Sequence, residues 1–233
     1  SILKIFWKEI AEAYHRKEFK KMESLYHRTS KRLYFLGAFL CAGALPWSNE
    51  IVLLIFGEEY LDGTLVFLLI LLYTVHQSMG QIGSTMLYAT EKSTVQVKIG
   101  LWFMAFSLVF VYFILAPKDM FIPGLEMGSE GLALKMVIMQ LIQVNIAAWF
   151  VAKIFNWKFE WLYQFIVLGL LIALGVSIKV LVINVLVINV IASILIASFF
   201  YIIIVMLAIY MMPWIVDMDK ELINNKITGY KLN

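Results

Sequence analysis

Polar side chains recur at intervals of three and four residues inside a long apolar segment of the chain. They are Tyr73, Gln77, Gln81, Ser84 and Tyr88, with Gly80 on the same face and His76 at its border. This spacing places them on one face of a helix, which we call the polar stripe. Amides and hydroxyls in a row offer hydrogen-bond donors and acceptors, and such a face contacts protein or water rather than acyl chains. Two interpretations stay open: contacts between packed helices, or the lining of a polar lumen.

Two lysines also lie inside apolar segments. Lys135 and Lys179 are each about four residues from the predicted outer boundary of their segment. A charge at this depth is costly, so it marks a pair, a path or a cavity unless its stem reaches the interface. Gln140 and Gln143 follow Lys135 on a broad arc of the same predicted helix. These residues are candidates for the path of an anionic substrate if they face inward.

No motif for catalysis or metal binding stands out. The chain has no P-loop, no GxSxG motif, no HExxH motif and no Cys/His metal spacing. The sequence therefore predicts no enzymatic activity, no cofactor and no metal site. Pro46 interrupts an apolar segment near its middle, and it predicts a kink that is either static or a hinge.

The elements that would position these residues are long apolar segments in a chain of 233 residues, of which 62% are hydrophobic. A soluble domain of this size cannot bury so much apolar surface. Each segment can cross a hydrocarbon core about 30 Å thick as a helix. The predicted fold class is therefore an all-α polytopic transmembrane bundle. The predicted spans are 33–56, 64–89, 99–116, 131–152, 162–182 and 190–212, with Asn184 and Asn189 at the last turn.

Basic residues are distributed unequally between the connecting segments. Sixteen of the 19 Lys and Arg residues lie in the N-terminal segment, in two alternate loops and in the tail. The loops of the other side hold Lys118 alone. The positive-inside rule then predicts a multi-pass protein of the plasma or inner membrane with both ends of this chain cytoplasmic. Residues 1–32 carry nine of the basic residues and are predicted as an amphipathic cytoplasmic linker or the end of a truncated span.

Three short motifs, taken in order, resemble one family. They are "LPWSNEIVLLIFGEEYLDG", "LYATEKSTVQVKIG" and "MGSEGLALKM". Over about residues 1–155 the chain is similar to the polysaccharide and oligosaccharide flippases of the multidrug/oligosaccharidyl-lipid/polysaccharide exporter superfamily. Members carry two six-helix lobes, sometimes with two further helices. The resemblance therefore implies that this chain is a C-terminal portion.

The resemblance also implies how the chain divides into segments. Residues 33–155 would be four helices of the C-terminal lobe, 156–212 two further helices, and 213–233 a cytoplasmic tail. The implied function is to flip a lipid-linked oligosaccharide or polysaccharide precursor by alternating access. The implied partners are membrane lipids, a polyprenyl-pyrophosphate-linked saccharide and the N-terminal lobe, but no nucleic acid. Lys135 is the stronger anion contact of the two lysines, because it lies within the lobe.

Other functions stay open. A cation-coupled drug antiporter of the same superfamily needs a carboxylate inside the membrane. Here every Asp and Glu is expected in a loop or at a span end. A non-transporting scaffold subunit would use the polar stripe only for assembly. A membrane-embedded transferase would show clustered carboxylates or a histidine near the interface, and His76 alone is weak support for one.

Overall fold

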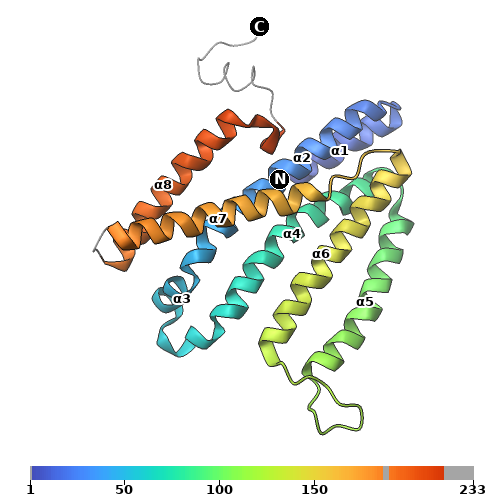
Figure 1. Ribbon diagram of the computed structural model, residues 1–233. Coiled ribbons are helices and arrows are strands. Elements are labelled where there is room, and N and C mark those ends of the chain that lie inside the picture. Colours follow the sequence, from blue (N-terminus) through green and yellow to red (C-terminus); the bar gives the residue numbers. More distant parts are fainter. Residues whose placement is uncertain (1, 186–188, 218–233) are drawn as a thin grey trace.

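The computed structural model of the protein describes residues 2–185 and 189–217 (Figure 1). Every regular element in these ranges is a helix, and six helical segments are long and apolar enough to cross a membrane. This confirms the predicted all-α polytopic bundle and indicates a membrane-embedded protein. The elements are α1 (Ile2–His15), α2 (Phe19–Ala44), η1 (Leu45–Trp47), α3 (Ser48–Phe56), η2 (Glu58–Gly63), α4 (Thr64–Ala89), α5 (Ser93–Leu115), α6 (Gly128–Phe155), α7 (Leu162–Val185), α8 (Val190–Met211) and η3 (Pro213–Val216).

The first span begins earlier than the hydropathy of the sequence predicts. Helix α2 starts at Phe19, inside the segment predicted as a surface linker, and continues without a break to Ala44. Met22, Leu25 and Tyr26 are buried on one face of this extension. Since its other face is basic, the extension is not apolar enough to register as a span, although it is helical.

Pro46 breaks this span, as the sequence predicts. The α-helix gives way to the short 3₁₀ segment η1, and α3 then carries the chain to Phe56. A proline lacks the backbone N–H that would continue the helical hydrogen bonding, so the break falls where the sequence requires it. Gly57 then adopts a φ of 95°, which favours glycine, and it turns the chain into η2.

The other spans lie close to their predicted positions. Helix α4 has the predicted bounds, while α5 begins six residues before the predicted start at residue 99. Asn184 lies within α7, and Asn189 caps the start of α8. Residues 186–188 of the predicted turn and residues 218–233 of the predicted tail lie outside the described residues.

The helices pack side by side in the order α5, α6, α4, α2, α7 and α8, with α1 against α2 and α4 (Figure 1). One buried cluster joins α2 to α7 and α8 and includes Tyr34, Val167 and Tyr201. A second cluster joins α1, α2, α4 and α6 and includes Ile10 and Met86. Helices α7 and α8 therefore share a core with the first span. We call the end of the bundle formed by α1, the α4–α5 turn and the α6–α7 loop the α1 end.

Helix α5 stands at the outer edge of the row. Ile99 is its one buried residue among those described, whereas Trp102, Phe106 and Leu108 are exposed. An apolar helix that exposes most of its surface is stable where the surroundings are acyl chains or another membrane helix. This helix forms one wall of the site described next.

Candidate functional site

The polar stripe of α4 faces a cavity shared with α5 and α6. Gln77, Gln81 and Ser84 of α4 line it together with Gln140 and Gln143 of α6, and its volume is about 320 Å³. The structure thus brings together five of the residues that the sequence singles out. Further lining comes from Leu3, Gly80, Thr85, Tyr88, Gln96, Ile99, Val144 and Ala147.

A second cavity continues the first one away from the α1 end. It has a volume of about 290 Å³ and is lined by Tyr73 of α4 and Lys135 of α6. Gln140 and Gln143 border both cavities, so the two are neighbours. We call the joined cavities the polar groove. It holds the predicted path residues except His76 and Lys179.

Lys135 supplies the positive charge of the polar groove. Its ammonium group donates a hydrogen bond to the hydroxyl oxygen of Ser107 on α5. Among the described residues that line the groove, none is Asp or Glu. The Lys135 charge is therefore held by a neutral partner and stays available to an anion.

Close packing of α4 on α6 forms the floor of the groove. A Cβ atom added at Gly80 would lie 2.9 Å from a methyl carbon of Val144 and 3.3 Å from Nε2 of Gln140. A larger residue at this position would force the side chains of Val144 and Gln140 to move. Gly80 thus allows the glutamines of both helices to face one small volume.

The sequence does not single out three polar residues of the groove, which are Thr85 on α4 and Gln96 and Ser107 on α5. Gln96 falls in a stretch predicted as a loop, but α5 already includes it. The signal was present, because Gln96, Gly100, Phe103 and Ser107 follow one another at helical spacing. All four line the groove.

His76 lies on a different side of α4. Its ring is buried 6.0 Å from the ring of Tyr34 on α2, measured between centroids. Nδ1 of His76 is buried and has no hydrogen-bond partner within the described part of the chain. The residue follows Tyr73 by three positions, yet the structure places it in the contact between α4 and α2 rather than in the groove.

Lys179 lies outside the groove as well, in α7. Its ammonium nitrogen is 2.5 Å from Oε1 of Glu50 and 2.7 Å from the carbonyl oxygen of Pro46. The expectation that every acidic residue lies in a loop or at a span end is wrong for Glu50. This residue lies in α3, six residues before the end of the first span at Phe56.

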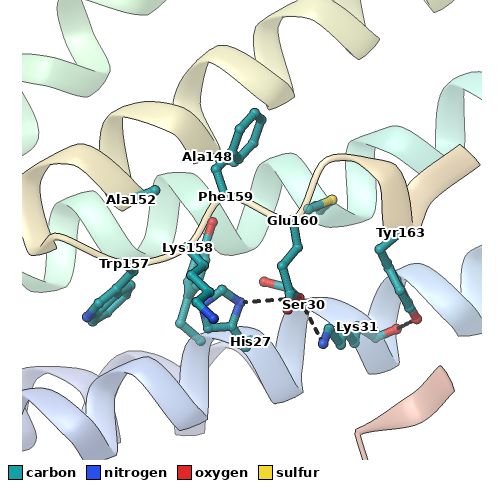
Figure 2. Close-up of a pocket in the computed structure, with 12 residues that line it drawn as sticks. His27, Ser30, Lys31, Ala148, Ala152, Trp157, Lys158, Phe159, Glu160 and Tyr163 are labelled. Atoms are coloured by element: carbon teal, nitrogen blue, oxygen red, sulfur yellow. Dashed lines mark hydrogen bonds and ion pairs between the residues drawn. The ribbon is translucent and has the colours of Figure 1, made fainter. Parts of the chain in front are cut away.

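A third polar cluster lies at the α1 end, where the α6–α7 loop crosses α2. Figure 2 shows Glu160 pointing from the loop toward His27 and Lys31. A carboxylate oxygen of Glu160 is 2.8 Å from Nζ of Lys31 and 3.9 Å from Nδ1 of His27. The enclosed space is about 30 Å³, which is room for roughly one water molecule. This cluster is therefore a contact between elements rather than a ligand cavity.

Comparison with protein-family models, with curated proteins and with solved structures gives no match. Within the described residues, no group of three or more His, Cys, Asp or Glu side chains could hold a metal ion. The polar groove and the sequence motifs are therefore the features that bear on function.

Proposed function

We propose that this protein is a membrane transporter that flips a lipid-linked oligosaccharide or polysaccharide precursor across the cell membrane. The observation that carries the proposal is a polar groove with one lysine, set among apolar helices. Amides and hydroxyls from α4, α5 and α6 face a common volume there. Each cavity of the groove has about the volume of a small-ligand site, roughly 300 Å³ or more.

The chemistry of the groove matches a sugar joined to a phosphate. Glutamine and tyrosine side chains both donate and accept hydrogen bonds, as sugar hydroxyls do. Lys135 provides a point charge for a phosphate oxygen. The nearby Ser107 hydroxyl can give up the ammonium group to such an anion at small cost, because the hydroxyl also bonds well to water or sugar.

The lining of the groove favours an open path over contacts that serve only assembly. If Gln77 and Gln81 held α4 to α6, their amides would bond to Gln140 or Gln143. The one pair of amide side chains joined by hydrogen bonds among the described residues is instead Asn145 and Gln164, which bond to each other twice, outside the groove. This supports a role for the groove glutamines in binding water or substrate.

A mostly apolar groove also lies between α5 and α6. It has a volume of about 670 Å³, and its walls include Trp102, Phe106 and Phe110. Phe103 and Met139 border both this groove and the polar one. Adjacent polar and apolar grooves fit an amphipathic substrate, with the saccharide in the first and a polyprenyl chain along the second.

The proposed mechanism is alternating access. A second lobe facing the polar groove would complete the cavity, and rocking of the two lobes would open it to each side of the membrane in turn. The distribution of Lys and Arg supports a plasma or inner membrane location with both ends of this chain cytoplasmic.

A cation-coupled antiporter is the alternative within the same superfamily. Glu50 provides the intramembrane carboxylate that such a protein needs, but Lys179 already pairs with it. A carboxylate with a built-in lysine partner is a poor site for a second cation. The structure therefore gives the antiporter less support than the flippase.

Thiol labelling of the full-length protein in its membrane tests the proposal. We would replace Cys41 by alanine, place single cysteines at Gln77, Gln81 and Lys135, and use Leu108→Cys as a control. Leu108 is 69% exposed on the outer face of α5. We expect a membrane-impermeant reagent to label the groove positions but not position 108, and a lipid-linked saccharide to reduce that labelling. If the groove positions resist labelling from both sides, the stripe serves packing and the scaffold function is favoured.

A further inference from the structure

Helix α7 contacts the first span at the break that Pro46 makes. Besides its bonds to Glu50 and to the Pro46 carbonyl, the Lys179 ammonium lies 4.7 Å from the centroid of the Trp47 ring. A carboxylate, a carbonyl oxygen and an aromatic face thus surround one cation. All three partners belong to the short stretch from η1 to the start of α3.

The pair lies at membrane depth. Lys179 and Glu50 are each six residues from the end of their helix, which is about 9 Å along the axis. Their side chains are 21% and 23% exposed. An unpaired charge in this position is expensive, whereas a bonded pair is tolerated.

Lys179 is the one side chain that donates a hydrogen bond to the Glu50 carboxylate among the described residues. Its second oxygen, Oε2, is buried without a partner among the described residues. Separation of α7 from α3 would therefore leave a bare carboxylate and a bare ammonium group in an apolar environment. The pair resists that separation more strongly than an exposed ion pair would.

Gly175 makes a second contact one turn earlier on the same face of α7. A Cβ atom added there would lie 2.5 Å from the carbonyl oxygen of Ala42 and 3.3 Å from Cγ of Pro46. The backbones of α7 and α2 thus lie close together at Ala42, before the break. Lys179 contacts Glu50, which comes after the break. Residues 175 and 179 together span the break.

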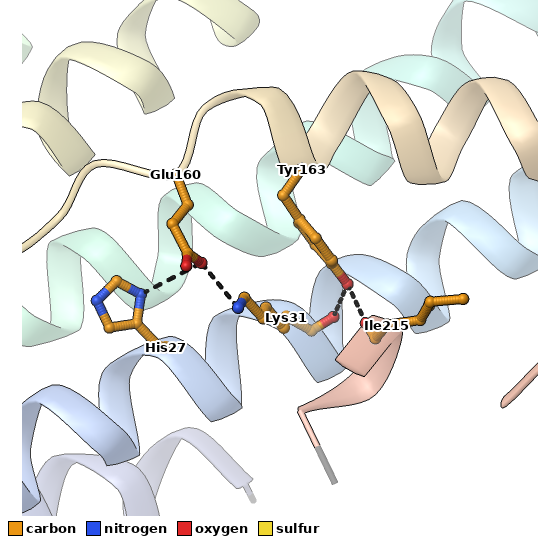
Figure 3. Close-up of polar contacts among 5 residues, drawn as sticks. All are labelled: His27, Lys31, Glu160, Tyr163 and Ile215. Atoms are coloured by element: carbon orange, nitrogen blue, oxygen red, sulfur yellow. Dashed lines mark hydrogen bonds and ion pairs between the residues drawn. The ribbon is translucent and has the colours of Figure 1, made fainter. Parts of the chain in front are cut away.

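The opposite end of α7 is fixed too. The Tyr163 hydroxyl donates to the carbonyl oxygen of Ile215 at 2.5 Å, and its oxygen also lies 3.2 Å from the carbonyl oxygen of Lys31 (Figure 3). Tyr34 of α2 donates to the carbonyl oxygen of Gln164 at 3.0 Å. With α7 held at its α1 end, the pair at Lys179 leaves little freedom for the rest of the helix.

We propose that Lys179 and Glu50 form a tether that fixes the angle of the first span at Pro46 and holds α7 and α8 against it. Lys179 is then a positioning residue and does not contact substrate. Pro46 is a rigid elbow rather than a hinge. Melting and distance measurements test the tether whatever the polar groove binds, whereas the transport measurement rests on the proposed function.

Charge reversal in the full-length protein tests the tether. We would compare Lys179→Glu, Glu50→Lys and the double exchange, with Lys118→Glu in the exposed α5–α6 loop as the control. Each single change leaves two like charges together, and we expect it to lower the melting temperature in detergent by at least roughly 5 °C. The double exchange should recover most of that loss and also recover transport of a lipid-linked saccharide. If the single variants melt at the wild-type temperature, the tether is excluded. The same follows if the double exchange melts at no higher temperature than the single variants. Recovered melting without recovered transport would instead assign Lys179 to substrate binding.

A neutral pair keeps the test decisive if the reversed charges prevent folding. Lys179→Met with Glu50→Gln removes both charges, which is tolerated far better than removal of one. Spin labels at the exposed residues Leu54 of α3 and Leu195 of α8 report the distance between α8 and the part of the first span beyond Pro46. We expect a broader distance distribution than in the wild type, and the same label pair with Lys118→Met as the unchanged control. An unchanged distribution in the neutral pair would contradict the proposal.

Discussion

At the scale of single residues, Lys135 and Lys179 occupy different surroundings although their positions in the sequence are similar. Lys135 bonds to a neutral hydroxyl in a cavity, whereas Lys179 is paired with a carboxylate. Both lie about the same distance inside apolar segments, so the sequence treats them alike. The partner of Lys179 is 129 residues away in the chain, and no local pattern announces it. Only the tertiary structure separates a lysine free to bind an anion from one that is already neutralised.

Replacement of Lys135 tests its role in transport. Lys135→Met keeps the length of the side chain and removes the charge. Since a hydrogen bond to a charged group contributes about 1.5–3 kcal/mol, we expect transport of a lipid-linked saccharide to fall about 10- to 100-fold. Lys135→Arg keeps the charge and should retain more activity than the methionine variant. Transport assays in proteoliposomes of the full-length protein would measure both, and equal activity of wild type and Lys135→Met would exclude the anion contact.

Gly175 offers a test of helix packing with a control in the same helix. Gly175→Ala places a methyl group against the Ala42 carbonyl oxygen, and we expect a loss of about 1–3 kcal/mol of stability. Gly169→Ala meets no atom within 4 Å and should behave like the wild type. Thermal unfolding in detergent would compare the two variants. Equal melting temperatures would show that α7 can move away from α2 without cost.

At the scale of the elements, the sequence predicted the spans well because apolar runs must be helical in a membrane. The predicted helix starts are wrong where a helix continues through polar residues. Helix α2 extends to Phe19 through basic residues, and α5 extends to Ser93 through Gln96 and Lys98. Hydropathy detects the part of a helix that lies in lipid, not the part that projects beyond it. The polar stripe was predictable because one periodic face in α4 has to avoid acyl chains.

The start of α8 provides an element-scale prediction. The Asn189 side-chain oxygen accepts a hydrogen bond of 2.8 Å from the backbone N–H of Ala192, so Asn189 caps the helix. Asn189→Ala should cost about 1 kcal/mol of stability. Asn184→Ala, within α7, removes no cap and is the matched control. Hydrogen exchange at the first turn of α8 should increase in the first variant only; similar exchange in both would show that water or lipid head groups satisfy this turn.

At the scale of the whole molecule, the row of helices divides into a held part and an open part. Helices α2, α7 and α8 share one core and are joined by hydrogen bonds at the α1 end and by the Lys179–Glu50 pair beyond Pro46. Helices α4, α5 and α6 enclose the polar groove, and α5 has few buried contacts. Of the three helices that enclose the groove, α5 has the fewest buried residues among those described, so it is the one least held by packing within this chain.

The charge distribution predicts the orientation of the whole molecule in the membrane. Glu91 in the α4–α5 turn and Lys158 in the α6–α7 loop lie at the α1 end, which carries most of the basic residues; Lys118 lies at the other end. We expect single cysteines at 91 and 158, in a Cys41→Ala background, to react with an impermeant thiol reagent only after the cell membrane is permeabilised. A cysteine at 118 should react in intact cells. The reverse pattern would place the α1 end outside, and the proposed flippase would then have to bind its substrate from the opposite end of the polar groove.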